Sequence, residues 1–194
     1  SSTTAQNGLR EVFIVGAART PVGSFQGALK AATAVQLGVA AVKGVLAQAQ
    51  VKPDQVEDLY FGQVLQAGAG QSPARQVVLG AGMPESTEAT TVNKVCASGM
   101  KAVMLASQNI QTGQRDLMVA GGMESMSNAP SALDAIVKDG LTDVYGDYPM
   151  GNCAEETAAK HQISREDQDK YCLESYRKAA EAWKNGAFKA EIAP

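Results

Sequence analysis

The chain has 194 residues, of which 45% are hydrophobic and 19% charged, and 17 basic against 20 acidic side chains give a formal net charge of −3. This is ordinary globular composition without the positive excess of a nucleic-acid-binding protein, and no apolar run reaches the roughly 18 residues of a membrane span. Neither nucleic acid nor a membrane is therefore expected as a partner. The cysteines, Cys96, Cys153 and Cys172, are too few for a disulfide framework and indicate a reducing compartment.

The beginning of the chain divides into a polar and an apolar stretch. Residues 1–10 (SSTTAQNGLR) lack an initiator Met and are expected to be disordered, as the remainder left by a removed targeting peptide or as residues added for expression. Residues 11–19 (EVFIVGAAR) form a short continuous apolar run. Such a run predicts a strand that is buried on both faces.

Helix-like and strand-like segments then alternate up to Gly122. In the second predicted helix, Ser72 is the expected N-cap and Pro73 the first helical residue. Alternation of this kind predicts an α/β fold in which helices are layered on a central sheet. The predicted helices cover residues 33–50, 73–82 and 98–113, and the predicted strands cover residues 58–65, 88–93 and 116–122.

The pattern changes after Gly122. Residues 123–163 are predicted to be rich in loops with short helical pieces. Residues 164–186 predict one long charged helix, because Ser164 is a suitable N-cap, acidic residues fill the first turn and Gly186 ends it. Residues 187–194 are predicted to begin another strand.

Cys96 lies between a predicted strand that ends near Asn93 and the start of a predicted helix. A thiol in this position meets unpaired N–H groups and the positive end of the helix dipole, both of which favour the nucleophilic thiolate. The residues after it, Ala97, Ser98 and Gly99, are small and leave room for an acyl group. Because buried structural cysteines are common, the residues alone leave a catalytic and a structural role open.

A catalytic Cys96 needs partners, since more thiolate alone lowers a barrier by less than about 1 kcal/mol. Glu124 follows a predicted strand end and is interpreted as a carboxylate that fixes a loop, with an acid/base role as the alternative. His161 has polar neighbours and is interpreted as a solvated surface residue. Met150 lies in a predicted loop and is a candidate for lining a pocket. No spacing of metal ligands is found, so no metal site is expected.

The segment GQVLQAGAGQSPA follows a predicted strand and opens a helix, as a dinucleotide-binding fingerprint does. Gly68 and Gly70 fit that pattern, but Pro73 stands where the third glycine would be. The next acidic residues, Glu85 and Glu88, follow a turn and not the end of a second strand. Nicotinamide binding is therefore not expected.

At NKVCASGMKA, residues 93–102, the chain resembles the acyl-enzyme cysteine signature of the thiolases. Within that family it is most similar to the biosynthetic acetyl-CoA acetyltransferase type, and the resemblance extends over nearly everything after Leu9. Further matching segments, in chain order, are VFIVGAARTPVGSFQGAL, GQVLQAGAGQSPARQ, DLMVAGGMESMSNAP and YPMGNCAEETAAK.

The resemblance implies a layered αβαβα fold with two similar core domains, of which this chain holds the first. It implies a core domain at residues 11–122, a loop region at 123–163, and a helix and strand at 164–194 that continue the core domain. The C-terminal domain, with the family's base, second cysteine and most CoA-contacting residues, is expected to be absent. Between Pro130 and Asp139 the chain is also shorter than the family pattern.

The implied activity is acyl transfer between CoA thioesters, in which two acetyl-CoA give acetoacetyl-CoA and CoA through an acyl group on Cys96. Met150 matches a family residue near the acyl pocket. No tightly bound cofactor is expected, and potassium is possible by resemblance. The resemblance further implies a homo-oligomer, as a dimer of dimers, in mitochondria or alternatively the cytoplasm. A β-oxidation 3-ketoacyl-CoA thiolase and a non-catalytic thiolase-like binding subunit are the alternatives, and this chain alone is expected to be inactive.

Overall fold

The computed structural model describes residues 8–194, except for the side chain of residue 132. The disorder predicted for residues 1–10 therefore lies mostly outside the described residues. Within that segment Arg10 is held in place, because its N–H donates to the carbonyl of Gln111 at 3.0 Å and its guanidinium pairs with Asp116. No helix among residues 8–194 is long and apolar enough to cross a membrane.

Three parallel strands form the central sheet in the order β2-β1-β3. These are β1 (Asp58–Gly62), β2 (Glu88–Val92) and β3 (Met118–Gly122). The strands are in step, so that their carboxyl ends, Gly62, Val92 and Gly122, lie side by side at one edge of the sheet. The α/β class and all three of these strands are confirmed, each one to three residues shorter than predicted.

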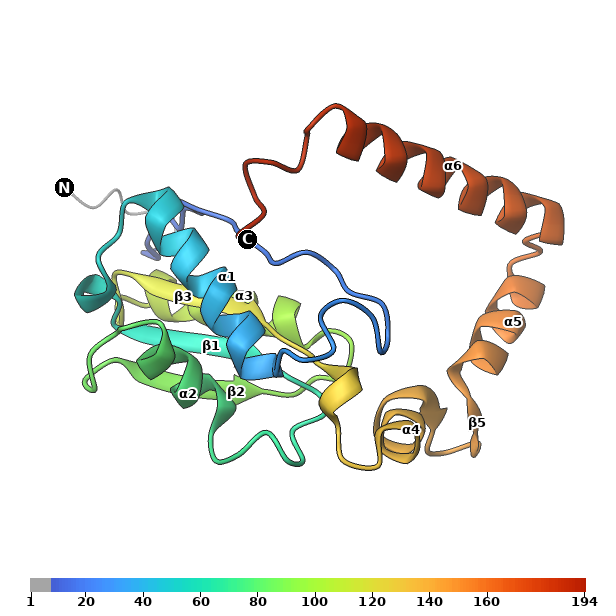
Figure 1. The fold of residues 1–194 in the computed structure, drawn as a ribbon, viewed down its shortest axis with the longest axis horizontal. Coiled ribbons are helices and arrows are strands. Elements are labelled where there is room, and N and C mark those ends of the chain that lie inside the picture. Colours follow the sequence, from blue (N-terminus) through green and yellow to red (C-terminus); the bar gives the residue numbers. More distant parts are fainter. Residues whose placement is uncertain (1–7) are drawn as a thin grey trace.

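Helices cover both faces of the sheet (Figure 1). On one face lie α1 (Ala34–Ala49) and α2 (Pro73–Gly80), and on the other lies α3 (Ser98–Gln111). Side chains alternate across β1: Leu59 and Phe61 are buried beneath α1 and α2, whereas Tyr60 accepts a hydrogen bond from Asn109 of α3 at 2.8 Å. The result is a three-layer unit.

The first helix begins at a capping box. The Thr33 hydroxyl accepts from the Gln36 N–H at 3.2 Å, and the Gln36 side chain accepts from the Thr33 N–H at 2.8 Å. The predicted cap Ser72 lies at the start of α2, but its side chain makes no capping hydrogen bond. Pro73 is the first residue of α2, as predicted.

Short elements occupy most of the predicted loop region. These elements are η2 (Met126–Asn128), α4 (Ala132–Ala135), the π-helical η3 (Ile136–Leu141), and the hairpin of β4 (Thr142–Asp143) and β5 (Tyr148–Pro149). One further short turn, η1 (Pro53–Gln55), lies earlier in the chain, between α1 and β1. The interpretation of Met150 as a loop residue is wrong: Met150 begins α5 (Met150–Lys160). Pro149, which looks like a helix breaker, is instead the N-cap, where its fixed φ and missing N–H cost nothing.

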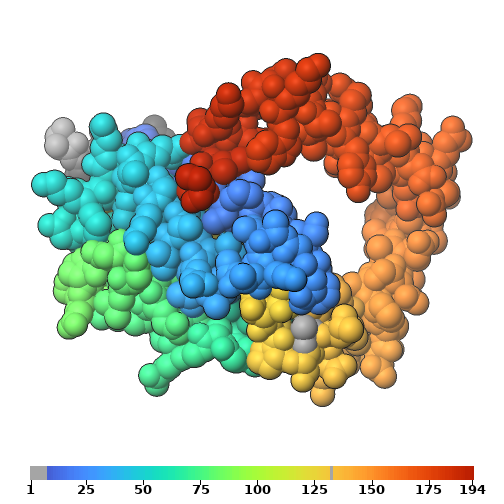
Figure 2. All heavy atoms as spheres, viewed as in Figure 1, coloured from blue at the N-terminus to red at the C-terminus, as the bar shows by residue number. Residues whose placement is uncertain are grey.

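We call α5 and α6 (Arg165–Lys184) together the arm, residues 150–184. Neither helix has a buried residue, and Figure 2 shows an opening between the arm and the core. The chain returns to the core at its end, where the Arg19 N–H donates to the carbonyl of Glu191 at 2.7 Å and the Ala193 N–H donates to that of Arg19 at 2.8 Å. The arm is thus anchored at its two ends only.

Two predicted strands are not present. Residues 11–18 are extended but belong to no strand, and Phe13, Ile14 and Val15 are 72%, 82% and 65% exposed. Residues 187–194 form turns, with a single bridge between Ile192 and Arg19. The buried-strand prediction for residues 11–19 is wrong in this structure because a strand needs a paired neighbour, and no strand of the described chain lies beside this segment.

Candidate functional site

Cys96 lies in the loop that joins β2 to α3, two residues before α3 begins at Ser98. Its thiol is exposed and forms no disulfide. The strand-to-helix junction predicted for Cys96 is therefore confirmed, and a buried structural thiol is contradicted. The Cys96 N–H donates no hydrogen bond to any other described residue, so it remains available at the positive end of α3.

The residue before the thiol has an unusual backbone. Val95 has a φ of +49°, in the left-handed region that a β-branched side chain rarely adopts. Its N–H donates to Oδ1 of Asn93 at 2.9 Å, and its carbonyl accepts from the Ser98 hydroxyl at 2.5 Å. The same hydroxyl accepts from the Lys94 N–H at 2.8 Å. These two side chains hold the turn that presents Cys96, together with backbone hydrogen bonds from the Ala97 N–H to the Lys94 carbonyl at 3.1 Å and from the Ser98 N–H to the Val95 carbonyl at 3.0 Å.

Glycine allows this turn to lie against the sheet. A Cβ on Gly62, the last residue of β1, would lie 2.6 Å from the carbonyl carbon of Ser98 and 2.7 Å from the nitrogen of Gly99. At Gly122 of β3, a Cβ would be 3.5 Å from the Cα of Gly99. The amino end of α3 therefore packs directly on the carboxyl ends of two strands.

An open cavity of about 400 Å³ lies at this edge of the sheet. Cys96 and Glu124 both line it, and most of the other lining side chains are apolar or absent. Its volume is within the ordinary range of small-molecule sites. The lining residues are Gly62, Gln63, Val64, Leu65, Val95, Cys96, Ser98, Gly99, Gly122, Met123, Glu124, Met126, Ile136, Gly140 and Leu141.

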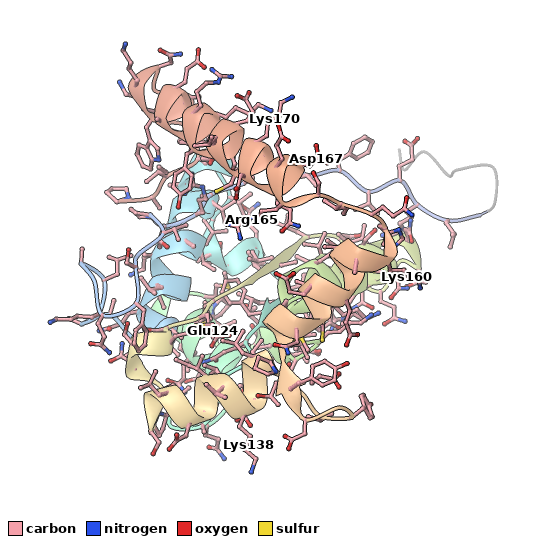
Figure 3. All side chains as sticks on the ribbon, turned by 90° about the vertical axis from the view of Figure 1, so that its right-hand side faces the viewer. Glu124, Lys138, Lys160, Arg165, Asp167 and Lys170 are labelled. Carbon is pink, nitrogen blue, oxygen red and sulfur yellow. The ribbon has the colours of Figure 1, made fainter. Side chains whose placement is uncertain are left out.

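Glu124 uses both carboxylate oxygens to hold the loop after β1. It accepts from the N–H of Val64 at 2.9 Å and from that of Leu65 at 3.2 Å. This supports the interpretation of Glu124 as a loop-fixing carboxylate, because each of its carboxylate oxygens accepts a hydrogen bond from the loop backbone. Figure 3 shows Glu124 on the core, apart from Lys160, Arg165, Asp167 and Lys170 on the arm.

The other sequence candidates lie away from Cys96. His161 is exposed at the C-cap of α5, as expected of a surface residue. Met150 is 38% exposed and does not line the cavity, so its place near an acyl group stays a prediction. Among residues 8–194, no group of three or more His, Cys, Asp or Glu side chains is placed to hold a metal ion.

The sequence did not indicate Asn93 and Ser98 as residues that hold the turn before Cys96, and Ser98 was treated only as a small neighbour. The spacing of Asn93, two residues before Val95, is the one signal that points to its role, since Asn side chains commonly bond the backbone two residues on. The left-handed conformation of Val95 has no sequence signal.

A parallel α/β sheet that presents an exposed thiol at a strand-to-helix junction places the protein in the class of α/β proteins with a strand-end cysteine site. The model of the thiolase N-terminal domain family matches residues 12–194, and the chain therefore belongs to the thiolase family.

Individual relatives agree. The chain is 54% identical over 199 residues to the mitochondrial acetyl-CoA acetyltransferase of Mus musculus, which covers 96% of this chain and 47% of the relative. It is 54% identical over 198 residues to the acetyl-CoA acetyltransferase of Yarrowia lipolytica, at 96% and 50% coverage. The chain spans about half the length of these relatives.

A solved structure shows the same fold. The crystal structure of Acat5 thiolase from Ascaris suum in complex with coenzyme A superposes with a TM-score of 0.90 at 42% sequence identity. The match covers 94% of this chain and 51% of that chain. The thiolase-like fold expected from the sequence is therefore confirmed for the part of the chain described here.

Proposed function

We propose that this chain is the nucleophile-bearing half of an acetyl-CoA acetyltransferase, which converts two acetyl-CoA into acetoacetyl-CoA and CoA and runs in reverse. One observation carries the proposal: the exposed Cys96 thiol lines an open cavity at the start of α3. The printed names of the relatives and of the CoA-bound neighbour support this choice of substrate.

In the first step, the Cys96 thiolate attacks the carbonyl carbon of acetyl-CoA, and the carbonyl π electrons move onto oxygen. The free Cys96 N–H at the positive end of α3 is suited to stabilise that oxyanion. When the carbonyl re-forms, CoA leaves as a thiolate and the acetyl group is bound to Cys96 as a thioester. One thioester replaces another, so little free energy is lost.

In the second step, another acetyl-CoA loses a proton from its methyl group, and the resulting carbanion attacks the acetyl carbonyl on Cys96. A carbon–carbon bond forms, the bond from carbon to the Cys96 sulfur breaks, and acetoacetyl-CoA leaves. In the described chain, Glu124 is occupied by two N–H groups and His161 lies outside the cavity. The base is therefore assigned to residues outside this chain. Without them, this chain alone should convert acetyl-CoA at a negligible rate.

The cellular location and the assembly of the protein are proposed from the same relatives. The relatives named mitochondrial support a mitochondrial location, and we further propose a homo-oligomeric complete protein without a tightly bound cofactor. The acyl-pocket role of Met150 belongs to this proposal as well.

The proposal is tested by incubating the complete protein with acetyl-CoA and locating the acetyl group by peptide mass mapping. We expect acetylation of Cys96 and not of Cys172, which is also exposed and serves as an internal control. Cys96→Ser should abolish turnover, whereas Cys172→Ser should preserve it. Equal acetylation of both cysteines would contradict the proposal, and a preference for long-chain 3-ketoacyl-CoA would move the activity to β-oxidation.

A further inference from the structure

The position of the Cys96 thiol depends on a backbone conformation that its own sequence disfavours. Val95 is left-handed at φ +49°. For a β-branched side chain this conformation raises the free energy of the folded backbone, as strained backbone at active sites does. Strain of this kind persists only where the surroundings fix it. At Val95 they do so through hydrogen bonds on both sides of the residue.

Ser98 supplies most of this support. It is 5% exposed, and its hydroxyl accepts from the Lys94 N–H while donating to the Val95 carbonyl. One hydroxyl therefore closes the turn across Cys96 and links the Asn93–Lys94 peptide to the Val95–Cys96 peptide, on either side of Val95. Asn93 holds the Val95 N–H from the other side, at 2.9 Å.

Ser98 is itself fixed in place. It is the first residue of α3, and the absence of a side chain at Gly62 lets its backbone lie directly against the end of β1. The hydroxyl consequently transmits the position of the sheet edge to the turn. Ser98 also lines the cavity, but its hydroxyl is engaged with the Lys94 N–H and the Val95 carbonyl. Its effect on the reaction therefore passes through Val95 and Cys96.

We propose that Ser98 is a positioning residue for Cys96, holding Val95 left-handed so that the thiol and the free Cys96 N–H face the cavity together. This inference rests on the proposed function, in which both groups act on the same acyl carbonyl. Misplacing a reacting atom by about 1 Å lowers the reaction rate roughly 100-fold, whereas substrate binding is weakened much less.

The test compares Ser98→Ala with the double variant Val95→Gly/Ser98→Ala in the complete protein, with Ser107→Ala in the same helix as a control. For Ser98→Ala we expect kcat to fall about 10- to 100-fold while KM changes less than about threefold. Glycine adopts positive φ without strain, so the double variant should recover most of the lost kcat. Ser107→Ala should match the wild-type protein.

Alkylation by iodoacetamide separates position from loss of the thiol: Cys96 should still react in Ser98→Ala. Wild-type kcat in Ser98→Ala, or a double variant as impaired as the single one, would overturn the positioning role. Failure of wild-type Cys96 to take an acetyl group would instead overturn the proposed function. If Ser98→Ala does not fold, Asn93→Ala removes the other side-chain bond to Val95, the one to its N–H, and the same kcat loss with the same glycine rescue is expected.

Discussion

Gly62 is the glycine of the site at which an added Cβ would lie closest to backbone atoms. The Cβ of an alanine there would overlap the backbone of Ser98 and Gly99, at 2.6 and 2.7 Å, and backbone atoms cannot turn aside as a side-chain end can. At Gly99 a Cβ would find its nearest neighbour, the carbonyl oxygen of Gly121, at an ordinary 3.8 Å. The two glycines therefore differ in kind, although both lie at the same contact.

We expect Gly62→Ala to lower the free energy of unfolding by about 3 kcal/mol, as overpacking of a fixed backbone contact does. Gly99→Ala should be neutral or stabilising by up to about 1 kcal/mol, because alanine favours the helix. Urea denaturation of both variants measures the difference. Equal stability of the two would contradict the close packing of α3 on β1.

Asp58 at the amino end of β1 is a buried acid whose carboxylate is only partly satisfied by hydrogen bonds and ion pairs. Its Oδ1 accepts no hydrogen bond within the described chain, and its Oδ2 lies 3.9 Å from Nε of Arg115, whose guanidinium is bonded to Glu88 at 2.8 Å. Burial, the largest cause, raises the pKa of Asp58 above its ordinary 3.8. The folded protein therefore holds this proton more tightly than the unfolded chain.

Because the folded pKa is raised, the stability that Asp58 contributes is fully present below pH 3.8 and is lost as pH rises through the folded pKa. Asp58→Asn mimics the neutral acid, so its free energy of unfolding should exceed the wild-type value at pH 7. The advantage should disappear below pH 3.8. Denaturation across this pH range checks the sign, with exposed Asp54→Asn as the charge control.

At the scale of elements, two helix caps of the same kind have different consequences. Thr33 caps α1, which contributes Val42 and Leu46 to the core. Ser164 caps α6 by accepting from the Asp167 N–H at 3.0 Å, yet α6 buries nothing. The first cap stabilises the core, and the second stabilises a helix that the core does not need.

We therefore expect Thr33→Ala to lower the free energy of unfolding of the core by about 1 kcal/mol. Ser164→Ala should reduce helix content and leave the unfolding of the core unchanged. Circular dichroism follows the helices, and fluorescence of a reporter tryptophan placed beside β1 follows the core. An equal effect of both variants on the reporter would show that the arm and the core unfold together.

Most elements could be predicted from the sequence because their signals are local. Apolar spacing located α1, the cap Ser164 with its acidic first turn located α6, and alternation with strands located the sheet. Two wrong predictions concern strands, because a strand forms only where another strand lies beside it. Residues 11–19 have the composition of a buried strand, but composition does not supply the neighbouring strand.

The same division holds within the site. The junction at Cys96 and the loop-fixing role of Glu124 followed from their positions after strands. The roles of Asn93 and Ser98 did not, because both depend on the left-handed φ of Val95, which only the folded backbone reveals. Functional residues that act through geometry are the ones that sequence patterns miss.

At the scale of the whole molecule, large apolar side chains remain exposed on many elements, and three groups of them stand out. They lie on the extended segment before α1, on the outer side of α3 and along α6, a distribution that soluble monomers rarely show. The residues are Phe13, Ile14 and Val15, then Met100, Val103 and Met104, and finally Tyr171, Leu173 and Tyr176. Together with the half-length coverage of the relatives, these faces support the proposal that further chain completes the protein.

The arm has a further consequence for how the molecule melts. With no buried residue, α6 depends on local charge pairs such as Arg165 with Asp169 and Arg177 with Glu174 and Glu181, and each of these exposed pairs stabilises the helix only weakly. Heating this chain should therefore produce two transitions, the first broad and weakened by salt, the second sharp. A calorimetric trace would then report two independent thermal units within a single polypeptide.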